Sequence, residues 1–235
     1  MQLHILGCHG PWPIAGGAAS GYLLSHNGKQ VLIDCGCGVL SRLLQLTDPA
    51  GLSAILLSHL HFDHASDLLT LSYYLQKQGV RLPVYVPPED ESPLKTLLSP
   101  DVYDLQPYPE KMEIAGIAVT SFPVRHPVPC RALRLEAEGK VLVYTGDTNT
   151  CDNLAAFARD ADVLLCDAAF LHSEWQEKLP HLSALKAAEL AAEAQAKHLR
   201  LTHLPTTHDK KTMEDEARSL FPAVKAAVPG DVIYL

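Results

Sequence analysis

Four side chains that could bind metal lie within six residues, in the segment His59-Leu60-His61-Phe62-Asp63-His64. At this spacing they cannot share one face of a helix, whereas a tight loop after a strand can direct them toward two neighbouring metal ions. Imidazole and carboxylate ligands suit zinc, and manganese or iron are the other candidates. A solvated polar loop is the alternative interpretation, but that is the usual fate of single histidines. The segment therefore predicts a metal site.

The strand expected just before this segment would position it. Residues 54–57 form a short, wholly apolar run that is typical of a strand buried on both faces, and the histidines begin where the run ends. In layered α/β folds the loops at the carboxyl ends of strands are the usual place for a site, because rigid strands hold loop side chains in position. The position of the segment therefore agrees with its chemistry.

Strands and helices are expected to alternate along the rest of the chain, with Asn27-Gly28 forming a hairpin turn and Ser183 a helix N-cap. We expect strands at 3–6, 22–25, 31–34, 54–57, 84–86, 117–122, 132–137, 141–144, 163–166 and 199–202. We expect helices at 39–46, 68–78, 93–98, 154–159, 183–197 and 213–220. Since no linker, low-complexity tract or repeat interrupts this order, we predict one domain over residues 1–235, with two sheets covered by helices.

The length and composition of the chain exclude several classes of protein. A chain of 235 residues, 47% of them hydrophobic, can bury a core without metals or disulfides, so bound metals would serve chemistry. The six cysteines are scattered and expected to be free, and Cys35-Gly-Cys37 lacks the second pair that a thiolate site needs. A charged leader and a long apolar run are both missing from the sequence, which favours a cytoplasmic protein that does not enter the membrane.

The charge of the chain favours small substrates. Its formal net charge is −8, and nucleic-acid binding depends heavily on Lys and Arg contacts to phosphates. Bound divalent cations would offset part of this charge at the site itself. The charge therefore weakens, without removing, the hypothesis of a polynucleotide substrate.

The residues around the histidines resemble the motifs of the metallo-β-lactamase superfamily, and this resemblance extends over nearly the whole chain. Asp34, after Val31-Leu32-Ile33, resembles the first motif, and 58–64 resembles the second. The later motifs are matched in order by His126, Asp147 and His203. The resemblance implies an α/β protein with the metallo-β-lactamase fold, a four-layer αββα sandwich.

The resemblance also implies a ligand set for two metal ions. It assigns His59, His61 and His126 to one ion, Asp63, His64 and His203 to the other, and Asp147 to a position between them. Asp34 is expected to orient a ligand histidine from just below the loop, the alternative being a strand-end turn residue. Two ions held in this way can carry a bridging hydroxide, which makes hydrolysis the expected chemistry. Superfamily members that bind two irons for redox work carry a motif resembling His-x-Glu-x-Asp. At the position of that glutamate this chain has a histidine, His61, which favours the hydrolase branch.

His181 favours the ribonuclease Z-like branch of the family. The sequence from His181 to Ser183 resembles the His-x-Ser/Thr helix start of those phosphodiesterases, and 126–130 and 7–10 resemble segments of their small bacterial relatives. A histidine just before a helix could protonate a leaving oxygen or bind a phosphoryl oxygen. A surface or capping histidine is the alternative. The chain departs from ribonuclease Z at Tyr144, where that enzyme carries a glutamate supporting the motif histidine.

The leading hypothesis is a two-metal zinc hydrolase that cleaves a small or cyclic nucleotide-like phosphodiester. In it, a metal-bridging hydroxide attacks phosphorus, Asp63 orients the hydroxide and His181 assists the leaving group. Transfer RNA is not expected as a partner, because the stretch 126–147 is too short for the long arm with which bacterial ribonuclease Z grips it. A homodimer is compatible with the resemblance.

Two other functions stay open at this point. The same hydroxide could attack the carbonyl of a thioester, lactone or β-lactam, which would make the chain an acyl hydrolase. If the chain were a non-catalytic binding module, some of the metal-ligand residues would be expected to be missing from the motifs, and none is missing. The role of the N-terminal loop is also open, including whether His9 faces the metals.

Overall fold

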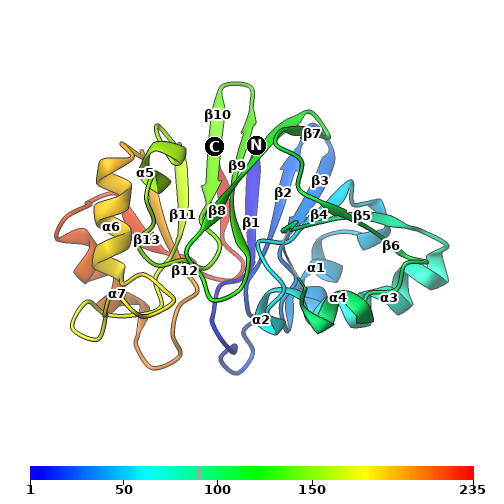
Figure 1. Ribbon diagram of the computed structural model, residues 1–235, viewed down its shortest axis with the longest axis horizontal. Coiled ribbons are helices and arrows are strands. Elements are labelled where there is room, and N and C mark those ends of the chain that lie inside the picture. The colour runs from blue at the N-terminus through cyan, green and yellow to red at the C-terminus, as the bar shows by residue number, and fades with distance from the viewer. Residues whose placement is uncertain (89–90) are drawn as a thin grey trace.

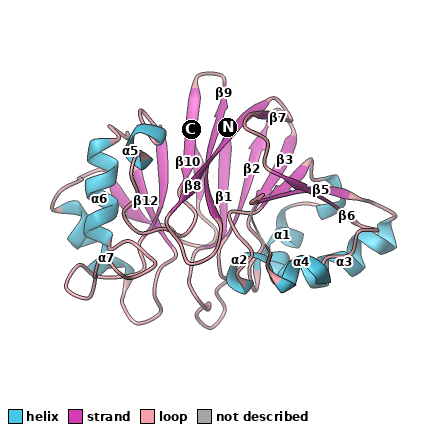
Figure 2. Cartoon of the chain, viewed as in Figure 1, coloured by secondary structure: helices cyan, strands magenta, loops and turns pink. Residues whose placement is uncertain are grey.

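The computed structural model describes residues 1–88 and 91–235, and within them the chain forms two seven-stranded sheets that lie face to face (Figure 1). Helices cover the outer face of each sheet, on either side of the central strands (Figure 2). The predicted four-layer αββα arrangement is therefore confirmed. No helix among the described residues is long and apolar enough to cross a membrane.

The first sheet has the strand order β14-β1-β2-β3-β4-β5-β6. Its strands are β1 (Gln2–Gly7), β2 (Gly21–His26), β3 (Lys29–Ile33), β4 (Ala54–Leu56), β5 (Leu82–Val86), β6 (Tyr103–Pro107) and β14 (Val232–Tyr234). The strands from β14 to β3 pair antiparallel, and those from β3 to β6 pair parallel.

The second sheet has the order β13-β12-β11-β10-β9-β8-β7. Its strands are β7 (Met112–Ile114), β8 (Ile117–Val124), β9 (Cys130–Ala137), β10 (Lys140–Tyr144), β11 (Val163–Asp167), β12 (Leu199–Thr202) and β13 (Val224–Ala226). Here the strands from β7 to β10 pair antiparallel, and those from β10 to β13 pair parallel. Each sheet is therefore half antiparallel and half parallel.

The helices fall into two groups, one for each sheet. The first sheet is covered by α1 (Val39–Leu46), α3 (Asp67–Gln78) and α4 (Pro93–Leu97), and the second by α5 (Leu154–Phe157), α6 (Ala184–Glu193) and α7 (Lys210–Arg218). Two single turns, η1 (Pro49–Gly51) and α2 (Phe62–Ala65), lie in the connections on either side of β4.

Most of the expected elements are present, and the differences have local causes. Asn27 and Gly28 both have positive φ, 47° and 72°, as a two-residue hairpin turn requires. Ser183 caps α6 by accepting a hydrogen bond from Lys186 N, but the helix ends at Glu193, before Gln195 takes a left-handed φ of 54°. The expected helix 154–159 also ends early, at Phe157, and the expected helix 213–220 both begins and ends earlier, at Lys210 and Arg218.

Four strands were not expected from the sequence: β6, β7, β13 and β14. Each has only three to five residues, which is too short for apolar alternation to stand out. Strand β14 pairs with β1, so both ends of the chain lie side by side in the first sheet (Figure 1). The last strand of the chain therefore completes the sheet that the first strand begins.

Two apolar cores hold the layers in place. One lies between the sheets, where Leu24 of β2 and Leu133 of β9 are fully buried. It continues beneath α6, where Ala188 is fully buried. The other lies between the first sheet and its helices. Tyr22 of β2 and Tyr144 of β10 meet edge to face across the two sheets, with ring centroids 5.1 Å apart. The relative position of the two sheets is thus set by close packing.

This packing brings the carboxyl ends of several strands to one edge of the molecule. In the first sheet β3 and β4 run parallel, and in the second β8, β10, β11 and β12 all run in one direction. Residues that follow these strands therefore gather at a common edge, as is usual for sites in α/β proteins. Every residue predicted as a metal ligand follows one of these strand ends.

A tight backbone contact at this edge gives a first prediction, at Gly36. A Cβ atom on Gly36 would lie 1.9 Å from the carbonyl oxygen of Asp63, a backbone atom that cannot move aside alone. Gly36→Ala should therefore lower the free energy of unfolding by about 1–3 kcal/mol in a urea titration. The matched control is Gly51→Ala, since a Cβ there meets nothing within 4 Å. Equal stability of the two variants would contradict this contact.

Candidate metal centre

Three histidines converge in the first of the two clusters that the sequence predicted. His59 Nε2 lies 3.0 Å from His61 Nδ1, which lies 3.2 Å from His126 Nε2. The carboxylate of Asp147 completes the cluster, with Oδ2 3.6 Å from His59 Nε2. These residues come from the loop after β4, the end of β8 and the end of β10, so the first cluster joins the two sheets.

The second cluster contains two carboxylates and two histidines. His203 Nε2 lies 3.2 Å from Asp63 Oδ2 and 3.2 Å from Asp147 Oδ2. His64 Nε2 lies 3.2 Å from Asp147 Oδ2 and 3.6 Å from Asp63 Oδ2. Asp63 and His64 stand on the single turn of α2, while His61 precedes it, so the predicted loop passes into one helical turn.

Asp147 belongs to both clusters. Its Oδ2 atom is shared between them, which is the arrangement that the sequence predicted for a bridging carboxylate. The structure thus brings together all seven residues predicted as ligands. Their binding of metal stays a prediction.

The unpaired atoms of the clusters fit a pair of cations. Ring nitrogens of three histidines face one another in the first cluster, where neutral rings have too few protons to satisfy every contact. In the second cluster His64 Nε2 and Asp147 Oδ1 are buried with no well-formed hydrogen bond among the described residues. Buried polar atoms are almost always satisfied, so atoms left in this state point to a ligand. A divalent ion in each cluster would satisfy them.

The pKa shifts of His59, His126 and Asp147 suit metal binding, whereas at His64 burial lowers the pKa but Asp147 and Asp34 more than offset this and raise it. Burial lowers the pKa of His59 well below its usual value and lowers the pKa of His126 to about 4. Burial raises the pKa of Asp147, but nearby His203, His64 and His59 together hold this pKa well below the usual aspartate value. A neutral imidazole and an ionised carboxylate are the forms that bind a divalent cation.

Asp34 holds the ligand loop from below, as predicted. Its buried carboxylate accepts hydrogen bonds from Ser58 N (2.7 Å), Ser58 Oγ (2.8 Å) and Tyr144 Oη (2.8 Å). The ring of His64 donates from Nδ1 to the same carboxylate at 2.8 Å, which leaves Nε2 to face the second cluster. Asp34 is fully buried and has a φ of 54°, a left-handed conformation that persists where the surrounding contacts hold the residue in place.

His181 lies against the second cluster. Its ring stacks on His203, with centroids 4.5 Å apart and 17° between the planes, and its Nδ1 lies 2.8 Å from Asp167 Oδ2. Burial lowers the pKa of His181, but the carboxylate of Asp167 more than offsets this and raises the pKa to about 9. The Nδ1–H group is therefore held toward Asp167, and Nε2 is left to act on a bound group.

Asp167 is a site residue that the sequence motifs did not reveal. It is fully buried at the end of β11, and its Oδ2 also accepts a hydrogen bond from Thr148 N at 2.8 Å. A signal was available, since Asp167 ends the apolar run 163–166 just as Asp34 follows 31–33. Tyr144 stands where ribonuclease Z carries its supporting glutamate, and here a carboxylate on the neighbouring strand, Asp167, pairs with His181.

The loop between β1 and β2 packs on the second cluster through its backbone. A Cβ on Gly10 would lie 2.0 Å from His203 Nε2, so only glycine fits there. His9 is buried but lies outside both clusters, with Nδ1 3.3 Å from the carbonyl oxygen of Ala18. The N-terminal loop therefore lies against the second cluster at Gly10, and His9 is not one of the clustered ligands.

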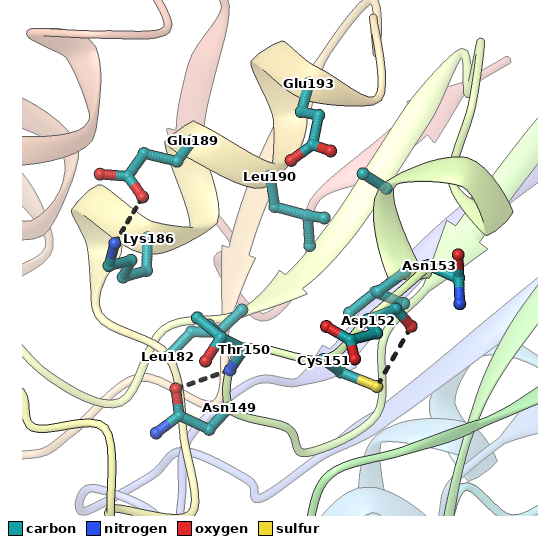
Figure 3. Close-up of a pocket in the computed structure, with 12 residues that line it drawn as sticks. Asn149, Thr150, Cys151, Asp152, Asn153, Leu182, Lys186, Glu189, Leu190 and Glu193 are labelled. Carbon is teal, nitrogen blue, oxygen red and sulfur yellow. Dashed lines mark hydrogen bonds and ion pairs between the residues drawn. The ribbon is translucent and has the colours of Figure 1, made fainter.

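The other histidines of the chain lie outside the clusters. This holds for His4, His26, His172, His198 and His208. All six cysteines fall in the described ranges and are free, as expected. A separate polar hollow of about 250 Å³ lies between 149–155 and α6 (Figure 3). None of the residues lining it belongs to the metal clusters, and its Lys186 pairs with Glu189 at 2.7 Å.

Comparison with known proteins agrees with this geometry. The family model described as "Beta-lactamase superfamily domain" matches residues 29–204. A protein of Bacillus subtilis named "Probable metallo-hydrolase YhfI" is 32% identical over 229 residues, which cover 94% of each chain. Its crystal structure, described as a metallo-beta-lactamase fold protein, covers 99% of this chain and 98% of its own, with a TM-score of 0.94 and 29% identity.

Two further proteins are similar over nearly the whole chain. A ribonuclease Z of Methanopyrus kandleri is 30% identical over 98% of this chain and 96% of its own. The crystal structure of a diphosphatase from the PhnP family has a TM-score of 0.79 at 20% identity, covering 100% of this chain and 97% of its own. The two His/Asp clusters are thus the binuclear site typical of this fold, on the scaffold of a metal-dependent hydrolase.

The shared position of Asp147 gives a prediction about metal content. Asp147→Ala should lower the metal bound per chain, because both clusters lose the same ligand. Elemental analysis of the purified variant measures this. The control is Asp152→Ala, an exposed carboxylate five residues further along the chain. Full metal content in the Asp147 variant would show that the bridging assignment is wrong.

Asp34 allows a separate test of the supporting hydrogen bonds. Asparagine tolerates the left-handed conformation, so Asp34→Asn changes the charge and the acceptors while keeping the backbone. We expect metal affinity to fall about 10–100-fold in competition with a chelator. Asp160→Asn is the matched control, since Asp160 is exposed and has a similar φ of 57°. An unchanged affinity in the Asp34 variant would exclude its supporting role.

Proposed function

Because the chain belongs to the metallo-β-lactamase superfamily, we propose that it is a two-zinc phosphodiesterase that acts on a small, nucleotide-like phosphodiester. The observation that carries this proposal is the Asp167–His181 pair, placed against His203 of the second cluster. Phosphodiester cleavage releases an alkoxide oxygen that needs a proton, and this pair can deliver one. Zinc is the proposed metal because the clusters offer imidazole and carboxylate ligands.

The metal ions and the side chains divide the work between them. When bound, two divalent ions lower the pKa of a water molecule and stabilise charge on the attacking and leaving oxygens. Asp63 joins the second cluster through Oδ2, and its other carboxylate oxygen, Oδ1, can accept a hydrogen bond from the attacking water. His181 donates its Nε2 proton to the leaving oxygen. Asp167 stabilises the charged ring and holds its orientation.

Several features favour a small substrate over transfer RNA. The net charge is −8, and the stretch between the ligands His126 and Asp147 is taken up by β9 and β10, which belong to the second sheet. That stretch therefore holds no long arm. Ribonuclease Z and the diphosphatase, both similar to this chain, bear names that refer to hydrolysis at phosphorus, which supports the reaction class but not one substrate.

The role of His181 can be tested with two kinds of leaving group. His181→Ala should lower kcat about 100-fold or more on a dinucleoside monophosphate, whose alkoxide leaving group needs a proton. The loss on bis-p-nitrophenyl phosphate should be much smaller, since p-nitrophenolate leaves without one. Metal content should stay full. His198→Ala is the control, because His198 is exposed and belongs to neither cluster.

Two results would contradict the proposal. Equal losses of kcat on both leaving groups would show that His181 does not act as the acid. Hydrolysis of a lactone or glutathione thioester in preference to every phosphodiester would instead establish the chain as an acyl hydrolase.

A further inference from the structure

Two hollows of nearly equal size flank the metal centre. The first, of about 490 Å³, lies beside His61 of the first cluster. The second, of about 480 Å³, lies beside His181 and His203. We call them the His61 hollow and the His181 hollow. Each volume is within the range that binds a small molecule or one part of it. The centre therefore has a binding space on both sides.

Both hollows have apolar walls with an exposed aromatic ring. Leu60, Phe62, Pro127 and Val128 line the His61 hollow. Pro11, Trp12, Phe170 and Pro205 line the His181 hollow. Phe62 is 69% exposed and Trp12 is 60% exposed, although large apolar side chains are usually covered. Rings in this position offer flat surfaces on which a ring of a ligand can stack.

The charged residues of the two hollows disfavour anionic groups. Among the described residues that line them, none is Lys or Arg. The carboxylates are Glu91 in the His61 hollow and Glu174 in the His181 hollow, the latter paired with His208 at 2.8 Å. A further phosphate in either hollow would meet no Lys or Arg side chain there and would be repelled by a carboxylate, and the charged ring of His181 is already paired with Asp167. The groups that fit are therefore uncharged.

From these observations we propose that the substrate is a diester of a single phosphate that carries an uncharged, ring-bearing group on each side. The inference rests on the proposed phosphodiesterase function. The leaving group lies in the His181 hollow, because the residue that donates its proton lines that hollow. The group that remains on phosphorus lies in the His61 hollow.

The reaction follows directly from this placement. The oxygen of water forms a bond to phosphorus and gives one proton to the Asp63 carboxylate, from which solvent later returns a proton to His181, while the ester bond on the His181 side breaks. The departing oxygen takes the proton from His181 Nε2. The group in the His61 hollow remains attached to phosphorus, and the product there is a phosphate monoester.

Two diesters with the same leaving group can separate the hollows. Bis-p-nitrophenyl phosphate and methyl p-nitrophenyl phosphate both release p-nitrophenolate, but they differ in the group that stays on phosphorus. Trp12→Ala should lower kcat/KM about ten-fold on both substrates. The ratio of kcat/KM for bis-p-nitrophenyl phosphate to kcat/KM for methyl p-nitrophenyl phosphate should then stay as in the unaltered enzyme. Phe62→Ala should lower this ratio about ten-fold, because only the bis-aryl substrate places a ring beside Phe62. Tyr73→Ala, which removes an exposed aromatic ring from α3, is the control and should change neither value.

A second comparison tests whether the enzyme disfavours a substrate with a further phosphate. The unaltered enzyme should cleave the p-nitrophenyl ester of thymidine 5′-phosphate at least ten-fold better, in kcat/KM, than the same ester with a second phosphate on the 3′ oxygen. A preference for the doubly phosphorylated compound would overturn the exclusion of further phosphates.

The outcomes distinguish this inference from the function on which it rests. The placement of the two groups is wrong if both variants keep the ratio and rates of the unaltered enzyme. It is also wrong if Trp12→Ala lowers the ratio and Phe62→Ala lowers both rates equally. In either case the proposed phosphodiesterase function would still hold. If no phosphodiester is hydrolysed by the metal-loaded enzyme, both the proposed function and this inference fall.

Discussion

The buried carboxylate of Asp34 joins the parts of the molecule that form the metal centre. It follows β3 and accepts hydrogen bonds from Ser58 after β4, from His64 on α2 and from Tyr144 on β10. Those donors come from both sheets. A buried ionised group is costly unless several donors satisfy it, so the loops that carry the donors are held in one arrangement. The direction in which His64 faces depends on that arrangement.

The main features of this site could be predicted because they are local in the sequence. His59, His61, Asp63 and His64 stand close together after a strand, and their residue types suit only a few kinds of chemistry. Asp34, His126, Asp147 and His203 each stand at a strand end within a family motif. The fold follows from the same order of strands and helices. Agreement between local pattern and overall topology is what makes such a prediction possible.

The features that the sequence did not reveal depend on contacts between distant segments. Asp167 becomes a site residue only when β11 lies beside β10 and the start of α6 brings His181 within 2.8 Å. The necessity of glycine at position 10 follows from its contact with His203, more than 190 residues away along the chain. The edge strands β13 and β14 are held by pairing rather than by their own sequence preference. Likewise, no local pattern brings Trp12 and Phe170 to one hollow.

The central claim is that the seven converging residues hold two divalent ions and that hydrolysis depends on both. The most direct measurement is a titration of chelator-treated protein with zinc, followed by metal content and by turnover of a phosphodiester in the same samples. We expect uptake to stop at two ions per chain, with turnover reaching its maximum only as the second ion binds. Saturation at one ion per chain, or full turnover in protein freed of metal, would contradict the two-metal site.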